Sequence, residues 1–175
     1  MPQLETPARP IFISQGEFVV GADERSISTI LGSCIATCLF DAEARIGGMN
    51  HFLLPEGRGD AIQAASFGVN AMELLINALI KRGAQRQNLR AKVFGGARMI
   101  AGLSDIGQKN VDFVLDFLDR EGIACVSRSL GGTQARRIEF WPTTGRVRQR
   151  LLGEGAVIQC PPPVAAGNGV EMFTD

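Results

Sequence analysis

Apolar residues recur along this chain with two different spacings. In two segments they repeat every three to four residues, which predicts amphipathic helices, one from Asp60 to Gly83 and one from Ser104 or Asp105 to Gly122. Elsewhere, short runs of β-branched and aromatic residues are bounded by Gly and Pro, a pattern typical of strands. The predicted strands are 11–21 (as one or two strands), 27–31, 35–40, 49–55, 91–97, 123–130, 136–141 and 146–152.

The apolar stripe of each predicted helix identifies the residues expected in the core. The stripe of the first helix is Ile62, Ala65, Val69, Met72, Leu75, Ile76 and Leu79. The stripe of the second helix is Val111, Val114, Leu115 and Leu118. Because strands come first and helices then alternate with strands, the order of elements predicts an α+β or mixed α/β fold.

The chain is 175 residues long, which fits one domain with a sizeable core. The predicted elements extend from 11 to 152, so we expect a single domain there and a flexible N-terminus at 1–10. Residues 153–175 are rich in Pro and Gly and are expected to form a mobile C-terminal tail.

Charge and composition exclude several classes of protein. Lys+Arg and Asp+Glu are balanced at 18 each, so no overall field favours nucleic acid or an anionic membrane. The N-terminus lacks the order of a signal peptide, and no apolar run approaches the ~18 residues of a membrane span. We therefore expect a cytoplasmic protein without membrane insertion. The arginines of the last third are expected on the solvated face of a hairpin, with docking of an acidic partner as the alternative; they are Arg128, Arg136, Arg137, Arg146, Arg148 and Arg150.

The cysteines do not suggest a disulfide framework or a metal site. They are scattered through a chain without an export signal, at Cys34, Cys38, Cys125 and Cys160. Structural zinc needs four ligands, usually in close pairs. Cys34 and Cys38 form the only close pair, and the sequence contains a single histidine, so zinc is not favoured.

Cys34 is the candidate nucleophile among these thiols. It follows Gly32 and Ser33 at the start of a predicted strand, where its side chain can face a cleft. Gly32 permits a tight turn, and backbone N–H groups at such a turn can stabilise an oxyanion. Cys38 lies inside the apolar run and is the better candidate for a structural thiol.

His51 is the single histidine and therefore the only imidazole that could act as a base for a thiol. It lies on the strand that follows the strand of Cys34, so a hairpin would bring the two together. An imidazolium neighbour would favour the thiolate at neutral pH. A hydroxyl could orient the ring, and Ser28 and Thr29 both precede the turn. Neighbouring side chains of a strand point to opposite faces, so only one of the two can reach His51.

Five stretches of this sequence resemble the CheD family of bacterial chemoreceptor glutamine deamidases. They occur in the family's order over roughly residues 11 to 152, and the combination of GSC and MNHFLLP is specific. The stretches are TILGSCIATCLFD at 29–41, GGMNHFLLP at 47–55, KVFGGARM at 92–99, IGQKNVDFVLDFLDREGI at 106–123 and LGGTQARRIEFWPTTGRV at 130–147.

The resemblance implies sheet layers with flanking helices, in a cysteine-hydrolase fold like that of certain bacterial toxin deamidases. It implies conversion of receptor glutamines to glutamates, with Cys34 as nucleophile, His51 as its histidine and Thr29 as the third residue. Neither a metal nor a nucleotide cofactor is implied. The expected partners are methyl-accepting chemotaxis receptors and the phosphatase CheC. Two alternatives stay open, a non-catalytic regulator of CheC and a cysteine amidase of small molecules.

Overall fold

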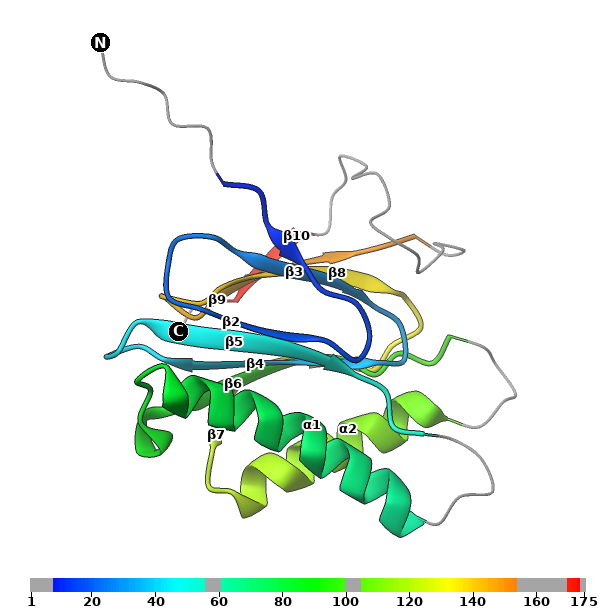
Figure 1. The fold of residues 1–175 in the computed structure, drawn as a ribbon. Coiled ribbons are helices and arrows are strands. Elements are labelled where there is room, and N and C mark those ends of the chain that lie inside the picture. Colours follow the sequence, from blue (N-terminus) through cyan, green and yellow to red (C-terminus); the bar gives the residue numbers. More distant parts are fainter. Residues whose placement is uncertain (1–7, 56–60, 100–104, 154–169, 174–175) are drawn as a thin grey trace.

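The computed structural model describes residues 8–55, 61–99, 105–153 and 170–173, and these form three layers. Two sheets lie face to face, and two helices cover the outer face of the second sheet (Figure 1). The helices are α1 (Ala61–Lys81) and α2 (Ile106–Arg120), with a short 3-10 helix η1 (Arg86–Asn88). This arrangement confirms the expected mixture of sheet and helix; the closer likeness to toxin deamidases stays a prediction.

Both sheets contain parallel and antiparallel pairs. In the first sheet the strand order is β1 (Ile11–Phe12), β3 (Ile27–Leu31), β8 (Arg136–Trp141), β9 (Arg146–Leu151) and β10 (Val170–Phe173). In the second sheet the order is β2 (Phe18–Gly21), β5 (Ile46–Phe52), β4 (Ile35–Asp41), β6 (Arg90–Gly95) and β7 (Ala124–Leu130). The strands expected from the sequence are thus all present, although β5 begins three residues before the predicted Met49.

Two apolar cores hold the layers together. One lies between the sheets and contains residues such as Phe40, Phe94 and Phe140. The other lies between the second sheet and the helices and contains Leu39, Leu75 and other aliphatic side chains. Since the second sheet is buried on both faces, its central strand β4 is apolar almost throughout, whereas β8 alternates between buried and half-buried residues.

The first half of α1 differs from the expectation. Ile62 is 71% exposed and Val69 is 41% exposed, and Ala65 is also exposed, so the predicted stripe is wrong for these three. Contact with the core begins near Gly68, where an added Cβ would lie 2.5 Å from the ring of Phe113. The helix slopes away from the sheet toward its N-terminal end, which leaves those apolar side chains uncovered (Figure 1). Asp60 lies outside the described residues.

The second helix follows the expectation more closely. Asp105 is its N-cap, and its carboxylate accepts a hydrogen bond of 3.0 Å from the backbone N–H of Gln108. Val111, Val114 and Leu118 are buried as predicted, while Leu115 is only half-buried. Both helices end two residues before their predicted glycines, Gly83 and Gly122, which have positive φ.

Two expectations about the last third of the chain need correction. Residues 170–173 are not a mobile tail: β10 pairs with β9 and forms the edge of the first sheet. The backbone carbonyl of Phe173 accepts a hydrogen bond of 3.0 Å from Nζ of buried Lys92, which anchors this strand. Arg136 is 3% exposed rather than solvated, because its guanidinium donates to the carbonyls of Ser129 and Gly131.

Candidate active site

The β4–β5 hairpin places the candidate nucleophile next to the candidate base. Ala36 of β4 lies opposite His51 of β5, and the ladder stops at the pair of Ile35 and Phe52. Cys34 is two residues before Ala36, just beyond the end of the ladder, and the alternation of the strand places its side chain on the same side of the sheet as that of His51. This face looks toward the first sheet, and Cys34 packs against the core between the sheets. This placement agrees with the hairpin expected from the sequence, and the pairing of Cys34 with His51 stays a prediction.

Thr29 of β3 reaches His51 across the space between the sheets. Its Oγ1 lies 2.7 Å from Nδ1 of His51 and 2.7 Å from the carbonyl oxygen of Ile13. The Ile13 carbonyl can only accept, so the hydroxyl hydrogen of Thr29 points to it, and Nδ1 of His51 must donate to Oγ1. The hydrogen bonds thus fix the Nδ1–H tautomer, which leaves Nε2 with the lone pair of a base.

Ser28 points elsewhere. Its Oγ donates to the carbonyl of Ile138 on the neighbouring strand β8 at 2.8 Å. Ser28 and Thr29 are both fully buried. The strand alternation expected from the sequence therefore brings the hydroxyl of Thr29, rather than that of Ser28, to the ring of His51.

The glycine pair at the end of β6 supports the turn that carries Cys34. The N–H of Gly96 donates to the carbonyl of Cys34 at 2.9 Å, and the N–H of Ala97 donates to that of Gly32 at 2.9 Å. Gly95 has a φ of +113°, and a Cβ there would lie 2.0 Å from the Cys34 carbonyl oxygen. Any side chain would thus push the turn away, so this pair allows the close approach of β6 to the candidate nucleophile.

The turn between β1 and β2 brings Gln15 to the thiol. Sγ of Cys34 lies 3.7 Å from Oε1 of Gln15. The turn is attached to the backbone of His51 on both sides, because Gly16 N–H donates to the His51 carbonyl at 2.7 Å and His51 N–H donates to that of Glu17 at 3.1 Å. Sequence reasoning missed Gln15, because nothing in the pattern of a short loop shows which side chain faces the site.

Burial favours the neutral forms of both candidate groups at pH 7. It raises the pKa of the Cys34 thiol to about 11, with a smaller lowering effect from the Cys34 backbone N–H. It lowers the pKa of His51 to about 4, with a smaller opposing effect from the Glu17 carboxylate. The expectation of an imidazolium that favours a resting thiolate is therefore wrong, because desolvation of both groups outweighs the nearby charges.

Asn110 of α2 also reaches the site, and it was missed by the sequence reasoning. Its Nδ2 donates to the carbonyl of Ser33 at 2.8 Å, and its Oδ1 accepts from the N–H of Leu54 at 3.0 Å. The residue is fully buried. The signal available in the sequence was a polar residue four positions before Val114, on the apolar stripe of a helix.

An apolar groove of about 120 Å³ adjoins His51 at the edge formed by β2, β5 and α1. Its lining is Gly16, Glu17, Phe18, Asn50, His51, Phe52, Phe67, Asn70, Ala71 and Leu74. Phe67 and Leu74 are 47% and 45% exposed and belong to the uncovered side of α1. The lining of the groove includes His51 but neither Cys34 nor Thr29.

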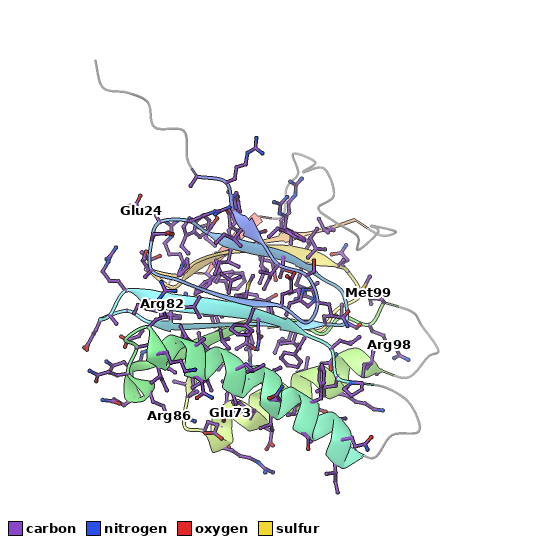
Figure 2. All side chains as sticks on the ribbon, viewed as in Figure 1. Glu24, Glu73, Arg82, Arg86, Arg98 and Met99 are labelled. Carbon is purple, nitrogen blue, oxygen red and sulfur yellow. The ribbon has the colours of Figure 1, made fainter. Side chains whose placement is uncertain are left out.

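Arg98 and Met99 are exposed and directly follow β6, at the end of the sheet that carries the Cys34 turn. Glu73 on α1, Arg82 and Arg86 lie farther along the helical layer (Figure 2).

Among the described residues, no group of three or more His, Cys, Asp and Glu side chains could hold a metal ion. None of the helices in the described part of the chain is both long and apolar enough to cross a bilayer.

Comparison with known proteins places this site in a family. Residues 53–151, more than half of the chain, match the family described as CheD chemotactic sensory transduction. This chain belongs to the CheD family. A relative from Caulobacter sp. (strain K31), named "Probable chemoreceptor glutamine deamidase CheD", is 51% identical over 166 residues, which cover 91% of this chain and 88% of the relative.

Other CheD relatives with the same name extend over nearly the whole chain. The one from Caulobacter vibrioides (strain NA1000 / CB15N) is 49% identical over 174 residues, 93% of this chain and 92% of its own length. The one from Agrobacterium fabrum (strain C58 / ATCC 33970) is 47% identical over 183 residues, 97% of this chain and 99% of its own length. The family predicted from the sequence is thus confirmed.

Proposed function

We propose that this CheD protein hydrolyses selected glutamine side chains of methyl-accepting chemotaxis receptors to glutamates, with Cys34, His51 and Thr29 as the catalytic residues. The observation that carries the proposal is the hydrogen-bond chain from the Ile13 carbonyl through Thr29 to Nδ1 of His51. These two hydrogen bonds leave Nε2 of His51 free to act as a base, on the face of the sheet that also carries Cys34. The names of the relatives supply the substrate.

The first half of the reaction forms a thioester. His51 Nε2 takes the proton of the Cys34 thiol as Sγ attacks the carbonyl carbon of the substrate side chain, so that a C–S bond forms and the carbonyl oxygen becomes an oxyanion. The backbone N–H groups of Ser33 and Cys34 are our candidates to stabilise this oxyanion. The imidazolium then protonates the departing nitrogen, the C–N bond breaks, and ammonia leaves.

The second half regenerates the enzyme. Neutral His51 takes a proton from water as the water oxygen attacks the thioester carbon. The C–S bond breaks, the imidazolium returns the proton to Cys34, and the product is a glutamate side chain. Since both groups start neutral, the proton transfer accompanies each attack and no resting ion pair is needed.

The groove beside His51 supports a protein substrate over free glutamine. An amino acid would need a cation for its carboxylate, and none of the described lining residues is Lys or Arg. The lining instead offers Phe18, Phe67 and Leu74, which suit the apolar side of a receptor helix. We therefore propose that the groove holds the cytoplasmic helix of the receptor, and that the reaction takes place in the cytoplasm.

The two alternatives receive less support. A regulator that only binds CheC would not need the Thr29 hydrogen bonds that orient His51, and binding of CheC stays a prediction. A small-molecule amidase would need polar groups to clamp its substrate. Neither alternative accounts for an exposed apolar groove whose lining includes the residue of the proposed base.

Mass spectrometry of receptor cytoplasmic fragments tests the function. Purified protein should convert specific receptor glutamines to glutamates, whereas ammonia release from free glutamine should stay at background. If free glutamine is hydrolysed rapidly and the receptor fragments are unchanged, the protein is a small-molecule amidase. If neither is modified and the protein binds CheC, it is a regulator.

A further inference from the structure

The hairpin of the active site opens at its catalytic end, and the backbone shows where. Beyond Ile35 and Phe52, the next pair with the same hydrogen-bond pattern would be Ser33 and Leu54. The carbonyl of Cys34 is bonded to β6, through Gly96 N–H. Carbonyls of successive strand residues point to opposite sides, so the carbonyl of Ser33 points toward β5, where Leu54 N–H would be its partner.

That direct hydrogen bond is replaced by the carboxamide of Asn110. The carboxamide accepts from Leu54 N–H at 3.0 Å and donates to the Ser33 carbonyl at 2.8 Å. A side-chain amide has the same donor and acceptor as a peptide unit, so it satisfies both backbone groups while holding the two segments apart. Cys34 and Leu53, which lie between these two residues and the last ladder pair of Ile35 and Phe52, are thereby kept out of the ladder.

The helix holds this carboxamide in one place. Asn110 is fully buried, and Val111 and Val114 beside it belong to the core between helices and sheet. One turn earlier, Gly107 lies so close to the loop after β6 that an added Cβ would be 2.5 Å from the carbonyl oxygen of Ala97. The face of α2 that carries Asn110 thus rests on the same loop that supports the Cys34 turn.

We propose that Asn110 is a positioning residue for the reaction: its carboxamide separates β4 and β5 at the catalytic end and fixes Cys34 relative to His51. The proposal rests on the proposed function. Asn110 touches neither the substrate nor the reacting atoms. It acts through the backbone of Ser33 and of Leu54, on either side of Cys34 and His51. Without it, Ser33 and Leu54 would either bond directly or take up water, and both changes move the thiol.

The test compares N110A with V114A and N110D in receptor-fragment deamidation. A displacement on the order of 1 Å can cost about 100-fold in rate, so N110A should lose at least about tenfold in kcat with little change in KM. V114A removes a fully buried side chain from the same helix face and serves as the matched control. It should lower thermal stability to a similar extent while its kcat stays near that of the wild type.

N110D adds a second measurement, the pH dependence of kcat, which should not change if Asn110 only fills space in the core. Its carboxylate can accept from Leu54 N–H, but it repels the Ser33 carbonyl until protonation supplies an O–H donor. The kcat of N110D relative to wild type should therefore rise as pH falls from 8 to 5, whereas that of N110A should stay flat. A flat ratio for N110D, or kcat losses that are equal in N110A and V114A, would overturn the proposal.

The failure of the proposed function would look different. If the wild-type protein deamidates no receptor, the rate at which iodoacetamide alkylates Cys34 replaces kcat as the measurement. A several-fold change in N110A that is absent in V114A would still support the positioning role. Equal alkylation rates in all three proteins would overturn it.

Discussion

Cys34 and Cys38 lie four residues apart on one segment and face the same core, yet their surroundings differ. Cys38 lies between Met49 of β5 and Lys92 of β6, in register with both, and is fully buried. Cys34 lies just before β4, outside the ladder, and is half-buried. Burial raises the pKa of both thiols. We therefore expect the two thiols to differ in reactivity through their position, because Cys34 lies where the ladder ends whereas Cys38 lies within it.

The largest effect should come from exchanging each thiol for a hydroxyl. Cys34→Ser should lower the rate of receptor deamidation by at least about 10³-fold, because a weakly acidic hydroxyl replaces the thiol of the proposed nucleophile. Cys38→Ser should keep wild-type kcat and instead lose about 1–3 kcal/mol of unfolding free energy, since its hydroxyl is buried. Single-turnover kinetics and urea unfolding measure the two effects. Deamidation by the Cys34→Ser protein would refute the assignment of the nucleophile.

Removing the imidazole of His51 should have the next largest effect on the rate of deamidation. It should change the reactivity of Cys34 and leave that of Cys38 unchanged. His51→Ala should lower kcat by roughly 10²–10⁴-fold, the usual contribution of general acid–base catalysis. Wild-type kcat/KM should remain level as pH falls through 6.5 and should decline only near the His51 pKa of about 4, below which the imidazolium cannot take a proton. An acid limb centred near 6.5 would mean that His51 is not desolvated as the structure indicates.

Alkylation distinguishes the neutral pair from an ion pair. A thiol whose pKa is raised to about 11 is protonated at pH 7, so alkylation of Cys34 should speed up with each unit of pH above neutrality. An ion pair would instead give a fast, level rate between pH 5 and 8. Protection of Cys38 from the reagent in the folded protein serves as the internal control.

The third comparison concerns the two hydroxyls that precede the turn. Thr29→Ala removes the acceptor of His51 Nδ1–H and should slow deamidation about tenfold, which corresponds to ~1.4 kcal/mol. Ser28→Ala loses a hydrogen bond to a carbonyl of β8 and should cost about 1 kcal/mol of stability at nearly unchanged rate. Thr29→Ser should recover most of the activity because it keeps the hydroxyl. If Ser28→Ala is the slower enzyme, the third catalytic role belongs to Ser28.

The sequence could predict most of the fold because the local patterns agree with the tertiary structure. Buried strands such as Ile27–Leu31 have β-branched residues and clear boundaries, and α2 has both a capping residue and an apolar stripe. It could not predict that α1 extends past the sheet and leaves Ile62 and Val69 exposed, since periodicity shows a face but not what covers it. Nor could it predict β10, because an edge strand after a Pro/Gly-rich segment has little local signal.

The same limit applies to the site. Cys34 and His51 stand out as candidates in the sequence because a thiol after a tight turn and a single imidazole have recognisable chemistry, whereas the residues alone left Ser28 and Thr29 open and the family resemblance favoured Thr29. The contacts of Asn110 and Gln15 depend on how a helix and a distant loop pack against the turn, and no spacing in the sequence encodes them. The state of charge was predicted wrongly for a similar reason, because the burial that shifts both pKa values is a property of the packed layers.

The smallest effect should come from Gln15, whose side chain contacts the sulfur of Cys34 and is far along the strand from Cys38. The thiol S–H is a weak donor, and its hydrogen bond to the carboxamide stabilises the protonated form. Loss of a weak bond worth roughly 0.5 kcal/mol should lower the thiol pKa slightly and speed alkylation of Cys34 about twofold in Gln15→Ala. Ser14→Ala is the matched control, because the turn bond from Ser14 to Glu17 uses the backbone N–H that the substitution retains. Alkylation of Cys38 should be unchanged in both proteins. A slower Cys34 in Gln15→Ala would mean that the carboxamide favours the thiolate, through its N–H group, rather than the thiol.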